Sequence, residues 1–111
     1  MDSTRQQRIG YLIREELAQL LLADSMSLYH CMITVTRTTV TKDLSIARSY
    51  LSIYDCPDRN AVLAEIRQNT KSIRFRLGQK LKNHLRIIPR CEFFIDDTLD
   101  YIENIEKLLK Q

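Results

Sequence analysis

Glycine, proline, cysteine and tryptophan are all scarce in this 111-residue chain, which holds two Gly, two Pro, three Cys and no Trp. So few Gly and Pro exclude a flexible linker or a low-complexity segment, and no internal repeat is present. No apolar run approaches the roughly 20 residues that span a bilayer, so we expect no membrane partner. The length and a hydrophobic content of 44% predict one globular domain over residues 1–111.

The three cysteines, Cys31, Cys56 and Cys91, are odd in number and widely spaced. This spacing argues against a disulfide framework and favours a reducing, cytoplasmic setting. His30 next to Cys31 has no C-x-x-C or H-x₃-H partner, so no metal site is expected. The charged first five residues are followed by no apolar stretch, and we therefore expect no secretory signal.

Acidic residues are missing from one long segment. Between Ile66 and Cys91, 26 residues contain no Asp or Glu. The same segment carries eight basic residues: Arg67, Lys71, Arg74, Arg76, Lys80, Lys82, Arg86 and Arg90. Residues 1–65 hold seven basic and eight acidic side chains, and residues 92–111 hold two and six. A solvated helix face usually mixes both signs. Concentrated positive charge releases counterions from phosphates, so the segment predicts a nucleic-acid partner.

Hydrophobic spacing predicts two long helical segments and three strands. Apolar residues recur every three or four positions over 4–24 and again over about 59–83, which is typical of amphipathic helices. Residues 32–40 are rich in β-branched side chains, and a change of buried phase indicates a β-bulge near Thr36–Arg37. Residues 45–54 alternate cleanly, with Arg48, Tyr50, Ser52 and Tyr54 on one polar-aromatic face.

The C-terminal part adds a strand and a short helix. Cys91, Phe93 and Ile95 alternate as a last strand, and Asp97 or Thr98 is placed to cap a helix that runs to Leu109. The predicted fold is therefore α+β, with the order α-β-β-α(α)-β-α. A hairpin and a strand reached by a helical crossover form a three-stranded sheet covered by helices on one face.

At about 100° per residue, the segment 59–83 separates an apolar stripe from a basic arc. That arc contains Arg67, Lys71, Arg74, Phe75, Gly78 and Lys82, and we expect it to point away from the core. Arg76 and Lys80 fall outside it. Phe75 either stacks on an unpaired base or packs against a neighbouring loop.

Four pieces of the chain resemble the ribosome-binding factor A family. The hairpin 41–52, Thr-Lys-Asp-Leu-Ser-Ile-Ala-Arg-Ser-Tyr-Leu-Ser, is similar to the family pattern Ser-Pro-Asp-Leu-Ser, an Ala two residues on, and a Tyr-x-Ser strand. Ile73-Arg74 followed by Leu77-Gly78 looks like the second half of its central helix pair. The remaining matches are Leu85-Arg86-Ile87-Ile88-Pro89 with Phe93, Asp96 and Leu99, and the first-helix residues Arg5, Arg8 and Ile9.

The resemblance implies a single KH-like RNA-binding domain of type II, in the order α-β-β-α-α-β with a short C-terminal helix. It also implies a cytoplasmic, monomeric assembly factor that binds the free 30S subunit and its 16S rRNA and assists late maturation and rRNA processing. No cofactor and no small-molecule substrate are implied. Where the family has a kink bearing Ala-x-Gly, this chain has Asn69-Thr70-Lys71, so a straight and a kinked junction both remain open.

The predicted RNA-binding residues come from the basic arc, the junction and the first helix. They are Arg5, Arg8, Arg67, Asn69, Thr70, Lys71, Arg74, Phe75, Lys82 and Arg86. Catalysis is not expected, because His30 and His84 lie in separate elements and no Gly-rich phosphate loop or nucleophile–base signature occurs. The alternatives are a general RNA- or DNA-binding KH-like module and a ribosome-associated protein-interaction domain that uses the polar-aromatic sheet face.

Overall fold

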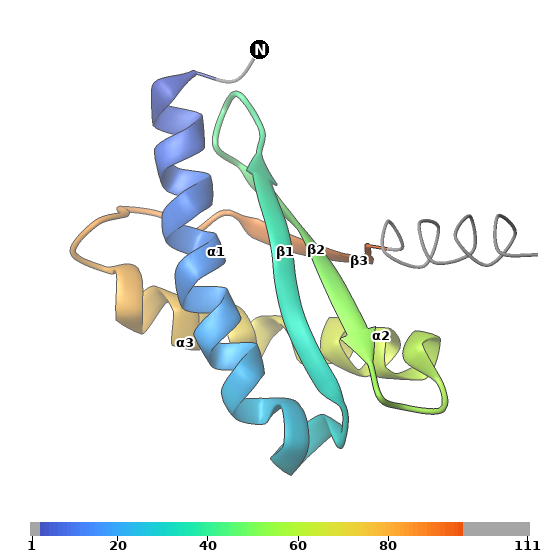
Figure 1. Cartoon of the computed structure of the whole chain (residues 1–111). Coiled ribbons are helices and arrows are strands. Elements are labelled where there is room, and N and C mark those ends of the chain that lie inside the picture. The colour runs from blue at the N-terminus through green and yellow to red at the C-terminus, as the bar shows by residue number, and fades with distance from the viewer. Residues whose placement is uncertain (1–2, 97–111) are drawn as a thin grey trace, which may run out of the picture.

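A computed structural model describes residues 3–96 (Figure 1). Its elements are α1 (Thr4–Asp24), a π-helical turn η1 (Ser25–Tyr29), β1 (Met32–Val40), β2 (Ile46–Tyr54), α2 (Arg59–Gln68), α3 (Thr70–Leu81) and β3 (Arg90–Ile95). Apart from the short turn η1, this is the α-β-β-α-α-β order expected for a KH-like domain of type II. The helix predicted near the C-terminus lies outside the described residues.

Helix α1 begins at a capping box and lies close against β1. The Ser3 side chain accepts from the Gln6 backbone N–H at 3.1 Å, and the Gln6 side chain accepts from the Ser3 N–H at 3.0 Å. The buried Gln6 amide also donates to the Val40 carbonyl at 3.0 Å, which ties the helix to the strand. A Cβ at Gly10 would lie 3.0 Å from the Thr38 carbonyl oxygen, a tight contact that favours a residue without a side chain.

The sheet has the order β1-β2-β3, with β1 antiparallel and β3 parallel to β2. The register shifts between Val35 and Arg37, which confirms the predicted β-bulge. Thr36 is the extra residue of the bulge. Val35 at an odd position and Val40 at an even position therefore both point to the buried face of the sheet. The Thr36 hydroxyl lies 3.1 Å from the Tyr50 carbonyl oxygen and 2.6 Å from an Asp96 carboxylate oxygen, near the end of β3.

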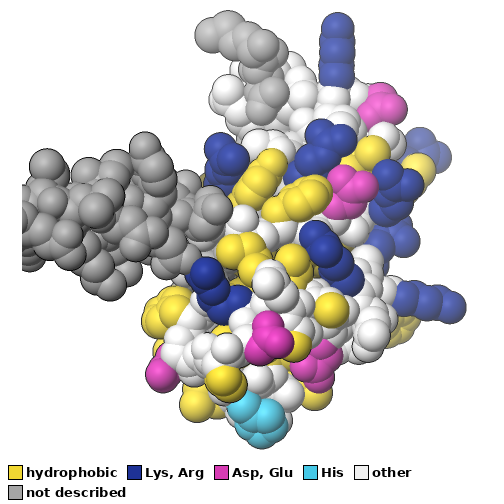
Figure 2. Space-filling model, turned by 90° about the vertical axis from the view of Figure 1, so that its right-hand side faces the viewer, with side chains coloured by type: hydrophobic (Ala, Val, Ile, Leu, Met, Phe, Trp, Pro, Cys, Tyr) yellow, Lys and Arg dark blue, Asp and Glu magenta, His cyan; other side chains and the backbone are white. Residues whose placement is uncertain are grey.

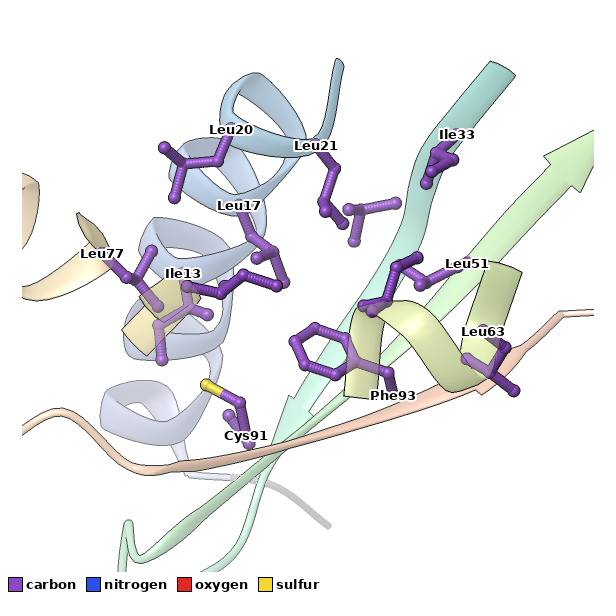
Figure 3. Packing of buried hydrophobic residues seen from close by; sticks show 14 of the residues in the cluster. Ile13, Leu17, Leu20, Leu21, Ile33, Leu51, Leu63, Leu77, Cys91 and Phe93 are labelled. Atoms are coloured by element: carbon purple, nitrogen blue, oxygen red, sulfur yellow. The ribbon is translucent and has the colours of Figure 1, made fainter. Parts of the chain in front are cut away.

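The core lies between the helices and one face of the sheet (Figure 3). Helices α1 and α3 lie on the same side of the sheet (Figure 1). Fully buried side chains come from every layer and include Ile13, Leu17, Leu21, Ile33, Leu51, Ile66, Ile73, Leu77 and Phe93. In β2 the odd positions are buried, as their alternation predicts. On the opposite face, Arg37 lies 4.2 Å from the Tyr50 ring centroid, and that ring stacks on Phe94 at 5.5 Å.

The long helical segment is interrupted at Asn69. This residue has φ −91° and ψ 8°, so it ends α2 and begins α3. Its side-chain amide donates to the Tyr29 hydroxyl at 3.1 Å, and the Thr70 hydroxyl donates to the Arg67 carbonyl at 2.7 Å. The break therefore needs no glycine, since the backbone at Asn69 has a negative φ that any L-residue adopts. The sequence left open whether the segment is one straight helix or two. The structure has two helices joined at Asn69, and Lys71 lies in the first turn of the second.

Candidate nucleic-acid interface

Two arginines of the predicted basic arc are engaged within the protein. Arg67 donates through Nε and Nη2 to the Phe93 carbonyl, at 3.1 and 2.7 Å. Arg74 donates through Nε to the Pro89 carbonyl at 3.1 Å and through Nη2 to the Ile88 carbonyl at 2.7 Å. Both guanidinium groups therefore hold the chain entering β3 and the strand itself against the helix pair.

This arrangement corrects the expectation that the whole arc points away from the protein. Arg74 is half-buried, because the chain after α3 returns along the helix. A Cβ at Gly78 would lie 3.5 Å from the side chain of Ile88, so the returning segment covers part of the arc. Helical periodicity predicts that these residues share one face. The segment between α3 and β3, which packs along the helix, determines how much of that face is exposed.

Two further cations of the acid-free segment have acidic partners that lie outside that segment. Arg76 pairs with Asp24 at the end of α1, with Nη1 and Oδ2 2.7 Å apart. The hydrogen bond to Asp24 raises the pKa of the Arg76 guanidinium, so this cation stays charged. Arg90 pairs with Glu92 at 3.2 Å on the exposed surface. Neither pair leaves its cation fully available to a phosphate.

The remaining four cations, Lys71, Lys80, Lys82 and Arg86, are exposed. None of their side chains has a hydrogen-bond or ion-pair partner among residues 3–96. Lys71 and Phe75 of α3 and its C-cap Lys82 lie within about 40° of one another around the helix axis. The Phe75 side chain is 67% exposed, so the alternative in which it packs against a loop does not fit. We call this row of three residues the α3 stripe.

The junction lies at the start of the α3 stripe. Asn69 and Thr70 are both half-buried and precede the exposed Lys71. The Asn69 amide group donates to Tyr29, whose pKa is raised chiefly by its burial, so the phenol stays neutral at physiological pH. An amide, a hydroxyl and an ammonium group therefore stand in sequence at one end of α3, and the hydroxyl hydrogen is donated to the Arg67 carbonyl.

The other predicted cations meet at a cavity of about 580 Å³. Arg5 and Arg8 reach it from the first turns of α1, and Arg86 reaches it from the segment between α3 and β3. The sequence named all three residues but not their meeting place. His84 and Asn83, which also line the cavity, were missed because a lone His or Asn in a loop carries no periodic signal.

Figure 2 shows that basic side chains are spread over one face of the molecule and do not form a uniform patch. Lys and Arg lie across the upper and middle parts of this view, among hydrophobic and acidic side chains. A mixed surface of this kind attracts phosphates through individually placed cations. The cations without an internal partner are therefore the candidates for phosphate contacts.

The cysteines and other potential ligands form no reactive or metal centre within residues 3–96. All three thiols are free, and burial raises the pKa of Cys31 and of Cys91 to about 11. Such thiols stay protonated near neutral pH. No group of three or more His, Cys, Asp or Glu side chains in the described range is placed to hold a metal ion. No described helix has the length and apolar character needed to cross a membrane.

We expect Arg74→Met to lower the free energy of unfolding by about 1–2 kcal/mol, because it removes two charge-assisted hydrogen bonds at a half-buried position. The matched control is Lys71→Met on the same helix, which removes a charge without an internal partner and should change stability by less than about 0.5 kcal/mol. Urea unfolding of both variants measures the difference. Equal stability of the two variants would contradict a structural role for Arg74.

Comparison with known proteins identifies the family. The family model described as "Ribosome-binding factor A" matches residues 5–109. A ribosome-binding factor A from Cytophaga hutchinsonii is 38% identical over 112 aligned positions, which cover 100% of this chain and 84% of that protein. One from Flavobacterium johnsoniae is also 38% identical, over 98% of this chain and 85% of its own length.

Solved structures agree on the fold. The crystal structure of ribosome-binding factor A from Thermus thermophilus superposes with a TM-score of 0.68 at 19% identity, over 81% of this chain and 94% of that one. A solution structure of a Thermotoga maritima protein described as a putative ribosome-binding factor A gives 0.53 at 23% identity, over 81% of each chain. The fold defines a small α/β domain of the KH-like kind. The chain belongs to the ribosome-binding factor A family.

Proposed function

We propose that this protein is a non-enzymatic assembly factor that binds the free 30S subunit through its 16S rRNA and assists late maturation and rRNA processing. Its family supports this proposal. A Thermus thermophilus relative, 18% identical with a TM-score of 0.59 over 77% of this chain and 92% of that one, is described as fitted into the cryo-EM map of a 30S complex. The structural observation that carries the proposal is the exposed α3 stripe, in which two lysines without internal partners flank an exposed aromatic ring.

The proposed contacts divide by chemistry. Lys71, Lys82, Arg86, Arg5 and Arg8 neutralise phosphates, because each is exposed and free of an acidic partner among residues 3–96.

The uncharged contacts lie at and beside the junction. Asn69 offers its second amide N–H to the sugar–phosphate backbone. The Thr70 hydroxyl already donates to the Arg67 carbonyl, so its oxygen accepts from a ribose 2′-OH. Phe75 stacks on an unpaired base. Arg67 and Arg74 act on RNA indirectly, by holding β3 and the segment before it in place against α2 and α3. The factor acts as a cytoplasmic monomer and needs no cofactor.

Sedimentation of cell extract tests the proposal directly. We expect the protein to travel with free 30S subunits and not with the unbound soluble fraction. Filter binding then compares structured 16S rRNA fragments with duplex DNA at equal salt. Equal affinity for both, without 30S association, would replace the proposal with a general nucleic-acid-binding module.

We expect the affinity for 30S subunits to fall steeply with salt. The proposed contacts include five cations, so log K should decrease with log[salt] with a slope of about −4. Titrations at several KCl concentrations measure the slope. An affinity that does not change with salt would mean that the contacts are mainly apolar or protein-mediated, and the proposed cations would lose their role.

A further inference from the structure

The cavity beside Arg5 and Arg8 combines an apolar floor with a cationic rim. Three segments distant in the sequence form it: the start of α1, the β1–β2 turn and the segment between α3 and β3. Its apolar lining residues are Ile9, Leu12, Leu44, Leu85, Ile87 and Pro89. Its volume of about 580 Å³ falls within the range of small-molecule sites, about 300–1,000 Å³.

The rim is positive because Arg5, Arg8 and Arg86 outnumber its one carboxylate, Asp43, which is hydrogen-bonded within its own turn. Asp43 Oδ1 accepts from the Ser45 hydroxyl at 2.7 Å, from the Thr41 hydroxyl at 2.8 Å and from the Ser45 N–H at 3.1 Å. These bonds, those from Ser45 above all, lower the pKa of Asp43. Asp43 forms no ion pair with Arg5 or Arg8, whose guanidinium groups have no partner among residues 3–96.

The walls are held in place before any ligand arrives. Leu44 adopts a left-handed backbone conformation with φ 62°, an uncommon one for a leucine, and its N–H donates to the Thr41 carbonyl at 2.8 Å. On the opposite wall, Arg74 binds the carbonyls of Ile88 and Pro89. A site whose shape is already set loses less entropy on binding than one that must be ordered.

We propose that this cavity takes one unpaired nucleotide of a single-stranded RNA segment. Its base lies on the apolar floor, beside Leu44 and Ile87, and its phosphate pairs with Arg8 and Arg86 on the rim. This inference deepens the proposed RNA binding and rests on it. A phosphate alone has no use for the apolar floor, and a base within a duplex cannot reach it. A nucleotide uses both parts.

The test is fluorescence anisotropy of the purified full chain with a labelled hexaribonucleotide, single-stranded or paired with its complement, at equal salt. We expect the single strand to bind at least about tenfold more tightly, since the stacking of one base in the cavity alone predicts that factor. Equal affinity for the two forms would overturn the proposal. AMP is titrated separately, and AMP binding tighter than that of the single strand would mean that the site serves a free nucleotide and not an RNA chain.

Ile87→Ser tests the floor without changing charge. The Ile87 side chain is 78% exposed, so its loss should leave the urea midpoint unchanged. We expect this variant to lose the part of the single-strand preference that the cavity provides, about tenfold, and to keep its duplex affinity. The matched comparison is Phe75→Ser, which removes the other exposed apolar side chain proposed to meet a base. Loss of the preference in Phe75→Ser alone would place base stacking on α3 and overturn the assignment to the cavity.

The rim is tested by Arg8→Gln/Arg86→Gln, which should lower single-strand affinity more than duplex affinity. An equal loss for both RNAs would mean that the two arginines act only through net charge, contrary to the proposal. Failure of this inference is distinguishable from failure of the proposed function. If the preference is absent while wild-type protein still sediments with 30S subunits, only the cavity assignment fails. If sedimentation with 30S subunits is absent, the proposed function fails.

Discussion

Lys71→Glu/Lys82→Glu is expected to weaken binding to 30S subunits by at least about 30-fold at physiological salt, with little change in stability. Both lysines are exposed and lie on one side of α3, on either side of Phe75. Removing two phosphate contacts should reduce the salt slope by about two, which accounts for that factor, and the repulsion of two carboxylates adds to it. Sedimentation measures the binding, and thermal unfolding verifies the fold.

The matched control for this variant is Lys107→Glu/Lys110→Glu, which makes the same change in net charge outside the described residues. We expect this control to keep most of the affinity. An equal loss in the two double variants would show that only net charge matters, and the α3 stripe would lose its special role. Normal binding of Lys71→Glu/Lys82→Glu would move the RNA surface to Arg5, Arg8 and the cavity.

Ile73→Ala is expected to lower the free energy of unfolding by about 2–5 kcal/mol. Ile73 lies on α3 only two residues from Lys71, but its side chain is 2% exposed and packs in the core between the helices and the sheet. Truncation removes buried apolar surface and leaves a cavity, since neighbouring side chains relax only partly. Urea unfolding with a linear extrapolation measures the change.

Most small domains have a stability of about 5–15 kcal/mol, so a loss of about 2–5 kcal/mol is a large share of it and, at the lower end of that range, leaves a marginal protein. Its binding to 30S subunits should therefore fall in proportion to the unfolded fraction and recover at lower temperature. A variant with wild-type stability would mean that α3 packs with a different face. Ile73 and Lys71 lie within one helical turn, but a change at Ile73 should act through stability and a change at Lys71 should act through binding.

Much of the fold follows from local pattern in the sequence. The 3.6-residue spacing over 4–24 gives the helix α1, and the alternation over 45–54 gives a strand whose odd positions are buried. The β-bulge was readable too, because Val35 and Val40 fall on opposite phases and both are buried. Periodicity did not separate α2 from α3, since the apolar stripe continues across Asn69 and only the backbone there departs from helix.

The candidate site was predicted less completely. The acid-free segment 66–91 and the basic first helix identified the cations, because charge is a property of composition. Whether each cation has an internal partner depends on the residues that lie next to it in the folded protein. Arg67 and Arg74 meet backbone carbonyls next to and within β3, and Arg76 meets Asp24 at the end of α1. No local pattern contains these pairings, because the partners lie 14 to 52 residues away.

The sequence by itself determined the class of the domain, the order of its elements and the concentration of positive charge, because these depend on the periodicity and composition of neighbouring residues. Only the tertiary structure decided which cations remain available. The chain returning from α3 to β3 covers Arg74 and leaves Lys71 and Lys82 exposed. The same return brings Arg86 to the cavity with Arg5 and Arg8, some 80 residues earlier in the chain. Contacts between distant segments form only when the core packs, so no local pattern records them.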